Sequence, residues 1–108
     1  MHSMRKQDRK FVINFPERQP IAGNPYSVEE VEEVIGGCAG CDKDEKRIFV
    51  EKGAPSEWER MVRYAHECIH GGEEEYGMGT FKDDPDDSDV DRLAHLFAEM
   101  LFAIVEAQ

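Results

Sequence analysis

The pentapeptide His-Glu-Cys-Ile-His at residues 66–70 contains the side chains of this sequence that are best suited to metal chemistry. An α-helix turns about 100° per residue, so His66 and His70 lie only about 40° apart on one face. One zinc ion can accept an imidazole nitrogen from each histidine. Glu67 follows the first histidine, where its carboxylate can act on a metal-bound water without being a ligand itself. The pattern therefore predicts a zinc site with Glu67 beside it.

This chemistry requires a helix, and the surrounding sequence predicts one. Ser56 and Glu59 have the spacing of a capping box, and Gly71-Gly72 is a stop signal. Six residues form a single apolar stripe at helical spacing: Trp58, Met61, Val62, Ala65, Cys68 and Ile69. Both histidines lie to one side of the centre of this stripe, where we expect the wall of a cleft.

A second amphipathic helix is predicted from about Asp89 to Glu106. Asp91 and His95 are four residues apart on its flank, with the same sense of rotation from the apolar stripe as the histidine pair. If the two helices pack antiparallel through their stripes, these flanks face the same side. We therefore expect Asp91 or His95 to reach a metal held by His66 and His70.

The remaining segments are short. In chain order they are predicted to form a strand at 10–15, a loop at 16–26, a helix at 27–35, a hairpin at 38–53 with its turn at 42–45, and a polar loop at 73–88. Cys38 and Cys41 could be half a zinc knuckle or a redox pair, but no second such pair follows, which favours two small residues in the hairpin. The acidic residues 83–89 favour a solvated loop over a calcium site.

The 108 residues have a formal net charge of -11, with 24 acidic and 13 basic side chains. Such a charge disfavours direct binding to nucleic acids, although an acidic DNA mimic stays open.

No apolar run is long enough for a membrane span, and no apolar segment follows the basic N-terminus, so we expect neither a membrane anchor nor a secretory signal. Three cysteines, an odd number, favour the cytoplasm. We expect a single domain over 1–108, with 1–9 flexible, and leave the oligomeric state open.

The segments YAHECIHGGEEEYGMG and VDRLAHLFAEML resemble the small zincin-like metallopeptidases of the ImmA/IrrE kind, including their short phage versions. Those proteins show H-E-x-x-H, then an E-Y-G segment, then E-x-x-A-N/H on the last helix. The resemblance implies a small α+β domain, with a twisted sheet of about three strands packed on the H-E-x-x-H helix and a C-terminal ligand-bearing helix. It implies His66, His70 and Asp91 as zinc ligands, although Asp91 stands where the family usually has Glu and His95 could take its place.

The function that this resemblance implies is hydrolysis of a peptide bond in a protein or peptide substrate. A zinc-activated water would attack the carbonyl, with Glu67 as general base, and Tyr76 or His95 could stabilise the oxyanion. Two alternatives remain open. The chain could be a non-catalytic binding protein with a zincin fold, or an acidic interaction protein such as a DNA mimic or inhibitor.

Overall fold

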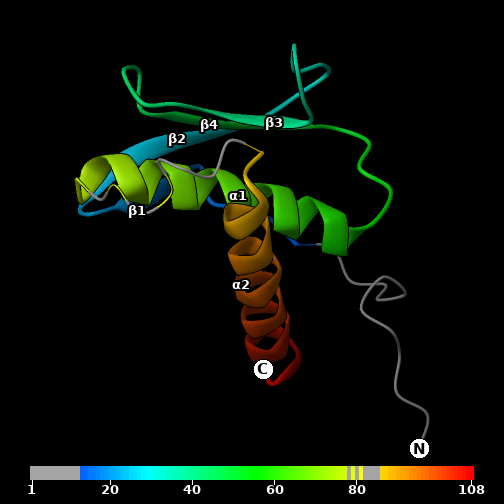
Figure 1. The fold of residues 1–108 in the computed structure, drawn as a ribbon. Coiled ribbons are helices and arrows are strands. Elements are labelled where there is room, and N and C mark those ends of the chain that lie inside the picture. Colours follow the sequence, from blue (N-terminus) through cyan, green and yellow to red (C-terminus); the bar gives the residue numbers. More distant parts are fainter. Residues whose placement is uncertain (1–12, 78, 80, 82–85) are drawn as a thin grey trace, which may run out of the picture.

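The computed structural model describes residues 13–77, 79, 81 and 86–108 of the chain. A four-stranded sheet packs on helix α1 (Glu57–Glu75), and helix α2 (Ser88–Glu106) packs on the side of α1 away from the sheet (Figure 1). The strands are β1 (Arg18–Ile21), β2 (Asn24–Val31), β3 (Ala39–Asp42) and β4 (Arg47–Glu51). This architecture confirms the predicted α+β class. The predicted flexible segment 1–9 lies outside the described residues.

The sheet is mixed and has one strand more than predicted. Its order is β1-β2-β4-β3, in which β2 and β4 are parallel and the two outer pairs are antiparallel. Ala22 and Gly23 join β1 to β2 in a tight turn, and both have positive φ values, 51° and 81°. Such a two-residue turn matches the twist of an antiparallel hairpin. Pro20 lies in β1, an edge strand, where its missing N–H costs no ladder hydrogen bond.

Strand β2 replaces the helix that the sequence predicts at 27–35. Ser27 and Glu30 have the spacing of a capping box, but β2 lies between β1 and β4, and the backbone N–H of Ser27 donates to Lys46 O at 2.9 Å. Tyr26 is completely buried. Pairing on both edges of β2 outweighs the local capping signal, so the helix prediction is wrong.

The N-terminal strand prediction is also wrong where the structure describes it. Residues 13–15 form no strand; instead the backbone N–H of Ile13 donates to Glu57 Oε2 at 3.0 Å. Phe15 stacks on Tyr64 with ring centroids 4.3 Å apart. This segment therefore packs along α1, and the β1 strand forms within the region expected to be a loop.

The predicted hairpin and both predicted C-terminal helices are confirmed. Ser56 caps α1 because its Oγ accepts the N–H of Glu59 at 3.1 Å. The helix runs through Gly71-Gly72 to Glu75, four residues past the expected stop at Gly71. A Cβ on Gly71 would lie 2.7 Å from Ile21 Cδ1, so glycine here permits close packing of α1 on β1 and does not end the helix.

The core lies between the sheet and α1, and α2 extends it on the far side of α1. From the sheet it includes Tyr26, Ile48 and Val50, all completely buried. From α2 it includes Ala94, Ala98 and Phe102, which are also completely buried. The N-terminal end of α2 meets the middle of α1, and the two helices cross where antiparallel packing was expected (Figure 1).

Candidate metal site

Helix α1 carries the pentapeptide at residues 66–70 near its middle, opposite the start of α2. One helical turn separates His66 from His70, and both rings point to the same region. Their Nε2 atoms lie 3.2 Å apart. The predicted pairing of these two histidines on one helical face is confirmed.

Asp87 completes this group from the residue that precedes α2. Its Oδ2 lies 3.4 Å from His66 Nε2 and 3.2 Å from His70 Nε2. Asp87 occupies the N-cap position with φ 57° and ψ 27°, a left-handed conformation, and its side chain makes no capping hydrogen bond. An aspartate at this position usually accepts an N–H of its own helix. Here the carboxylate is turned toward the two histidines instead.

The spacing of the three atoms matches that of ligands around a tetrahedral zinc ion. Two ligands on a tetrahedral zinc with bonds of 2.0–2.1 Å lie about 3.3 Å apart, and the three distances here are 3.2, 3.2 and 3.4 Å. Each ring nitrogen carries at most one hydrogen, and the carboxylate only accepts. In every tautomer, at least one of the three contacts therefore brings together two donors or two acceptors. A cation bound between the three atoms would remove this repulsion.

Two further carboxylates lie beside the other ring nitrogens. Asp91 Oδ1 is 3.8 Å from His66 Nδ1, and Glu73 Oε1 is 3.9 Å from His70 Nδ1. Both distances are longer than a hydrogen bond. A carboxylate that comes within hydrogen-bond distance of the second nitrogen of a metal-binding histidine would hold the ring and its tautomer in place. Asp91 is the third ligand that the resemblance implies, but the geometry puts Asp87 in that position and Asp91 behind His66. A ligand role for Asp91 stays a prediction.

Glu67 is buried, and its charge acts on the thiol of Cys41 in β3. Its carboxyl lines a cavity of about 330 Å³ together with His66, Asp87 and Asp91. Burial raises the pKa of Glu67 above its ordinary value; the nearby His66 lowers it, and the charge of Asp87 raises it further. A buried carboxyl with a raised pKa beside candidate metal ligands is a candidate for proton transfer.

Arg63 also lines this cavity, although it was not among the site residues predicted from the sequence. It lies one turn before Glu67 on α1, with its side chain only 19% exposed and its Nε 3.8 Å from Glu59 Oε1. Among the described residues that line the cavity, it brings the only permanent positive charge. Its helical spacing from Glu67 was visible in the sequence, but an arginine on a helix flank carries no metal-binding signature.

The two predicted oxyanion donors lie elsewhere. Tyr76 is 67% exposed at the C-terminal end of α1 and lines a different cavity, with Phe81 and Leu93. His95 Nδ1 lies 2.8 Å from Asp91 O, and its ring is 5.9 Å from Trp58. The structure therefore brings neither residue into the group of His66, His70 and Asp87.

The cysteines form no disulfide within the described part of the chain. Cys41 is half-buried, and burial raises the pKa of its thiol to about 11. Metal ligation requires the thiolate, so this environment disfavours Cys41 as a ligand. The interpretation of Cys38 and Cys41 as small hairpin residues agrees with these positions.

No protein-family model matches this chain, and the comparisons with curated proteins and with solved structures find no match either. Within the described residues, neither helix combines the length and the apolar character that crossing a membrane requires. What the site can do must therefore be argued from its own geometry.

Proposed function

We propose that this chain is a zinc-dependent metallopeptidase, with His66, His70 and Asp87 holding the ion and Glu67 as general base. The observation that carries the proposal is the triangle of two Nε2 atoms and one carboxylate oxygen with sides of 3.2 to 3.4 Å. Three protein ligands leave a fourth position of a tetrahedral ion open, as in catalytic zinc sites.

A bound zinc ion would supply Lewis acidity, polarising a carbonyl and making water a stronger acid. The chain supplies the remaining parts. Glu67 takes a proton from the attacking water and returns it to the leaving nitrogen. Arg63 offers a guanidinium in the same cavity to the negative charge that develops on the carbonyl oxygen. Asp91 and Glu73 keep the histidine rings oriented.

A peptide substrate is supported by the strand beside the cavity. Gly37, Cys38 and Ala39 line it, and Ala39 begins β3, an edge strand of the described sheet. An extended peptide can pair with such an edge through main-chain hydrogen bonds, which would hold its carbonyl groups in a row near the site. The resemblance to the ImmA/IrrE kind of metallopeptidase supports the same reaction.

The Glu67→Gln variant tests the reaction directly. We expect it to keep zinc, because Glu67 is not among the three ligands, and to lose at least about a hundredfold in peptide cleavage, because a general base contributes about that much. Cleavage is measured by mass spectrometry on a mixture of unstructured peptides, with zinc content measured in the same samples.

Two results would count against the proposal. Equal cleavage by Glu67→Gln and the wild type would remove Glu67 from the mechanism. A zinc-loaded wild type that leaves every peptide intact would favour the non-catalytic binding protein instead.

A further inference from the structure

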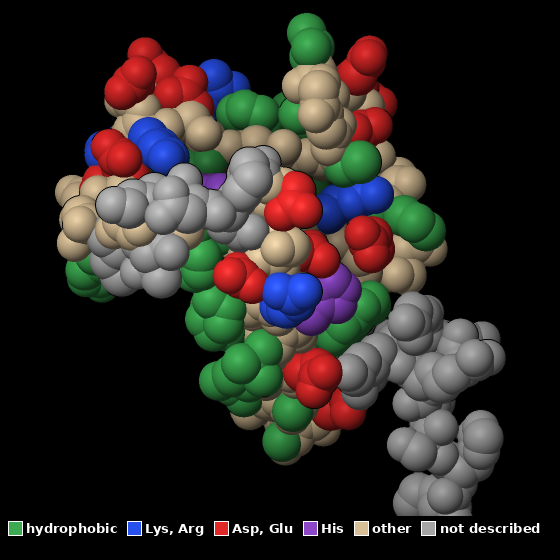
Figure 2. Space-filling model, in the orientation of Figure 1, with side chains coloured by type: hydrophobic (Ala, Val, Ile, Leu, Met, Phe, Trp, Pro, Cys, Tyr) green, Lys and Arg blue, Asp and Glu red, His purple; other side chains and the backbone are tan. Residues whose placement is uncertain are grey.

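Helix α2 carries apolar side chains around more of its circumference than α1 covers. Ala94, Ala98 and Phe102 are completely buried on one face. Six large apolar side chains, spread over about half of the helix circumference, are 38% to 56% exposed: Leu96, Phe97, Met100, Leu101, Ile104 and Val105. The C-terminal half of α2 projects from the body of the molecule, and hydrophobic side chains line one side of it (Figures 1 and 2). We call these six residues the α2 ridge.

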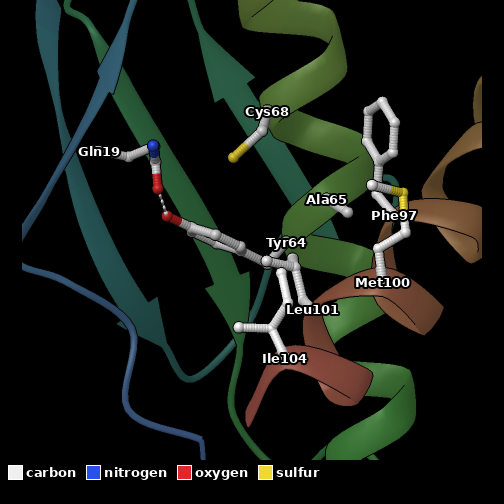
Figure 3. Close-up of a pocket in the computed structure, with 8 residues that line it drawn as sticks. All are labelled: Gln19, Tyr64, Ala65, Cys68, Phe97, Met100, Leu101 and Ile104. Atoms are coloured by element: carbon white, nitrogen blue, oxygen red, sulfur yellow. Dashed lines mark hydrogen bonds between the residues drawn. The ribbon is translucent and has the colours of Figure 1, made fainter. Parts of the chain in front are cut away.

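An apolar groove runs beside this ridge, where α1 and α2 cross. One cavity of about 320 Å³ lies between Tyr64, Ala65 and Cys68 of α1 and the side chains of α2, with Gln19 hydrogen-bonded to Tyr64 at its edge (Figure 3). A second cavity of about 290 Å³ shares Cys68 and Phe97 with the first. None of the described residues that line either cavity is charged.

We propose that this face is the interface of a homodimer, in which the α2 ridge of each copy enters the groove of the other around a two-fold axis. Ridge and groove lie on the same face, so the surface can be complementary to itself, as a two-fold interface requires. The proposal goes beyond the zinc chemistry and does not depend on it.

The charges favour a second copy over a basic partner. A basic helix would find no carboxylate in the uncharged groove to pair with. Two chains of net charge -11 repel each other. Because the interface itself is uncharged, the repelling charges of the two copies stay far apart, and dissolved salt screens their repulsion. A dimer of this kind should therefore tighten as salt rises, whereas a complex driven by charge attraction would weaken.

The area agrees with a weak dimer that forms at micromolar or higher concentration. At their exposed fractions, the six ridge side chains offer roughly 550 Å² per copy, against about 800 Å² per partner in a standard specific interface. The groove walls on α1 add little to this area, because Tyr64 and Ala65 are only 6% and 4% exposed. An apolar patch of this size at the centre of an interface is where the strongest contacts usually lie.

Sedimentation equilibrium tests the proposal on the full chain, from about 1 to 200 µM at low and high salt. We expect a transition between 12.4 kDa and twice that mass. Ile104→Glu places a charge on the ridge at a residue already 56% exposed, so the fold should persist and dimerisation should weaken at least about thirtyfold. Ile35→Glu is the matched control, since Ile35 is 97% exposed outside the α2 ridge. Circular dichroism confirms that both variants fold.

The proposal is overturned by a wild type that stays at 12.4 kDa over the whole range at both salt concentrations. It is equally overturned if a folded Ile104→Glu variant dimerises as the wild type does, or if Ile35→Glu weakens the dimer to the same extent. Dimers that dissociate as salt rises would also contradict it.

Discussion

Asp87 determines the geometry of the candidate metal site more than any other residue outside the helix of the two histidines. Its backbone is left-handed, with φ 57°, a conformation that aspartate tolerates better than most residues. That turn directs the carboxylate away from its own helix and toward both Nε2 atoms. Backbone strain of this kind is often found at functional sites, because the surrounding contacts hold it in place.

The roles of Asp87 and Asp91 can be separated by zinc affinity. If Asp87 is the ligand and Asp91 orients His66, Asp87→Ala should weaken zinc binding more than a hundredfold and Asp91→Asn only about tenfold. Asp89→Asn is the control, because Asp89 pairs with Arg92 on the exposed side of α2. Competition titration with a chromogenic chelator measures all three. The reverse order, with Asp91→Asn the more damaging, would restore Asp91 as the ligand that the resemblance implies.

Among the individual site residues, the sequence predicted those whose relative positions depend on helical periodicity alone. His66, Glu67 and His70 belong to one uninterrupted helix, so their relative positions followed from the turn per residue. Asp87 could not be found in this way, because its position depends on a backbone turn inside an acidic segment that resembles a solvated loop. An aspartate directly before a predicted helix was the available signal, and it more often indicates a cap.

The helices and strands position the site through three independent contacts. Ser56 begins α1, Gly71 lets α1 approach β1, and the crossing of the helices brings the start of α2 to the histidines. The predicted antiparallel packing would have brought Asp91 or His95 within reach of the metal. The crossing instead brings only the start of α2 close to the histidines. Asp87 and Asp91 therefore lie near His66, while His95 contacts Trp58.

The cap of α1 can be tested by its effect on stability. Ser56→Ala removes the acceptor of the Glu59 N–H and should lower the free energy of unfolding by about 1 kcal/mol. Ser56→Asp keeps an acceptor and adds a negative charge at the helix N-terminus, so it should be neutral or slightly stabilising. Urea unfolding followed by circular dichroism measures both. A similar loss in the two variants would show that the capping hydrogen bond does not stabilise α1.

The elements that the sequence predicted correctly are those with a strong local signal. Both C-terminal helices have long amphipathic patterns, and the hairpin at residues 39–51 has a turn rich in polar residues. Strand β2 was missed partly because its parallel partner β4 comes much later in the chain, Ser27 pairing with Arg47, so this pairing is non-local. The capping-box spacing of Ser27 and Glu30 was a local signal that these pairings overrode.

Among the described residues, the molecule combines a candidate metal site with an exposed apolar face on α2. The alternative of an acidic interaction protein explains the net charge of -11. It does not explain why one carboxylate oxygen and two imidazole nitrogens lie 3.2 to 3.4 Å from one another. Zinc binding therefore separates the metal-dependent functions from the acidic interaction protein, and cleavage then separates the enzyme from the binding protein.

X-ray absorption at the zinc edge tests the proposed zinc site, on protein purified without a histidine tag and given one equivalent of zinc. We expect a first shell of nitrogen and oxygen at about 2.0 Å, with the outer-shell signature of two imidazoles. We also expect the His70→Ala variant to lose one imidazole. A sulfur shell at about 2.3 Å would instead indicate ligation by the cysteines. That result, or a protein that retains no zinc, would contradict the proposed site.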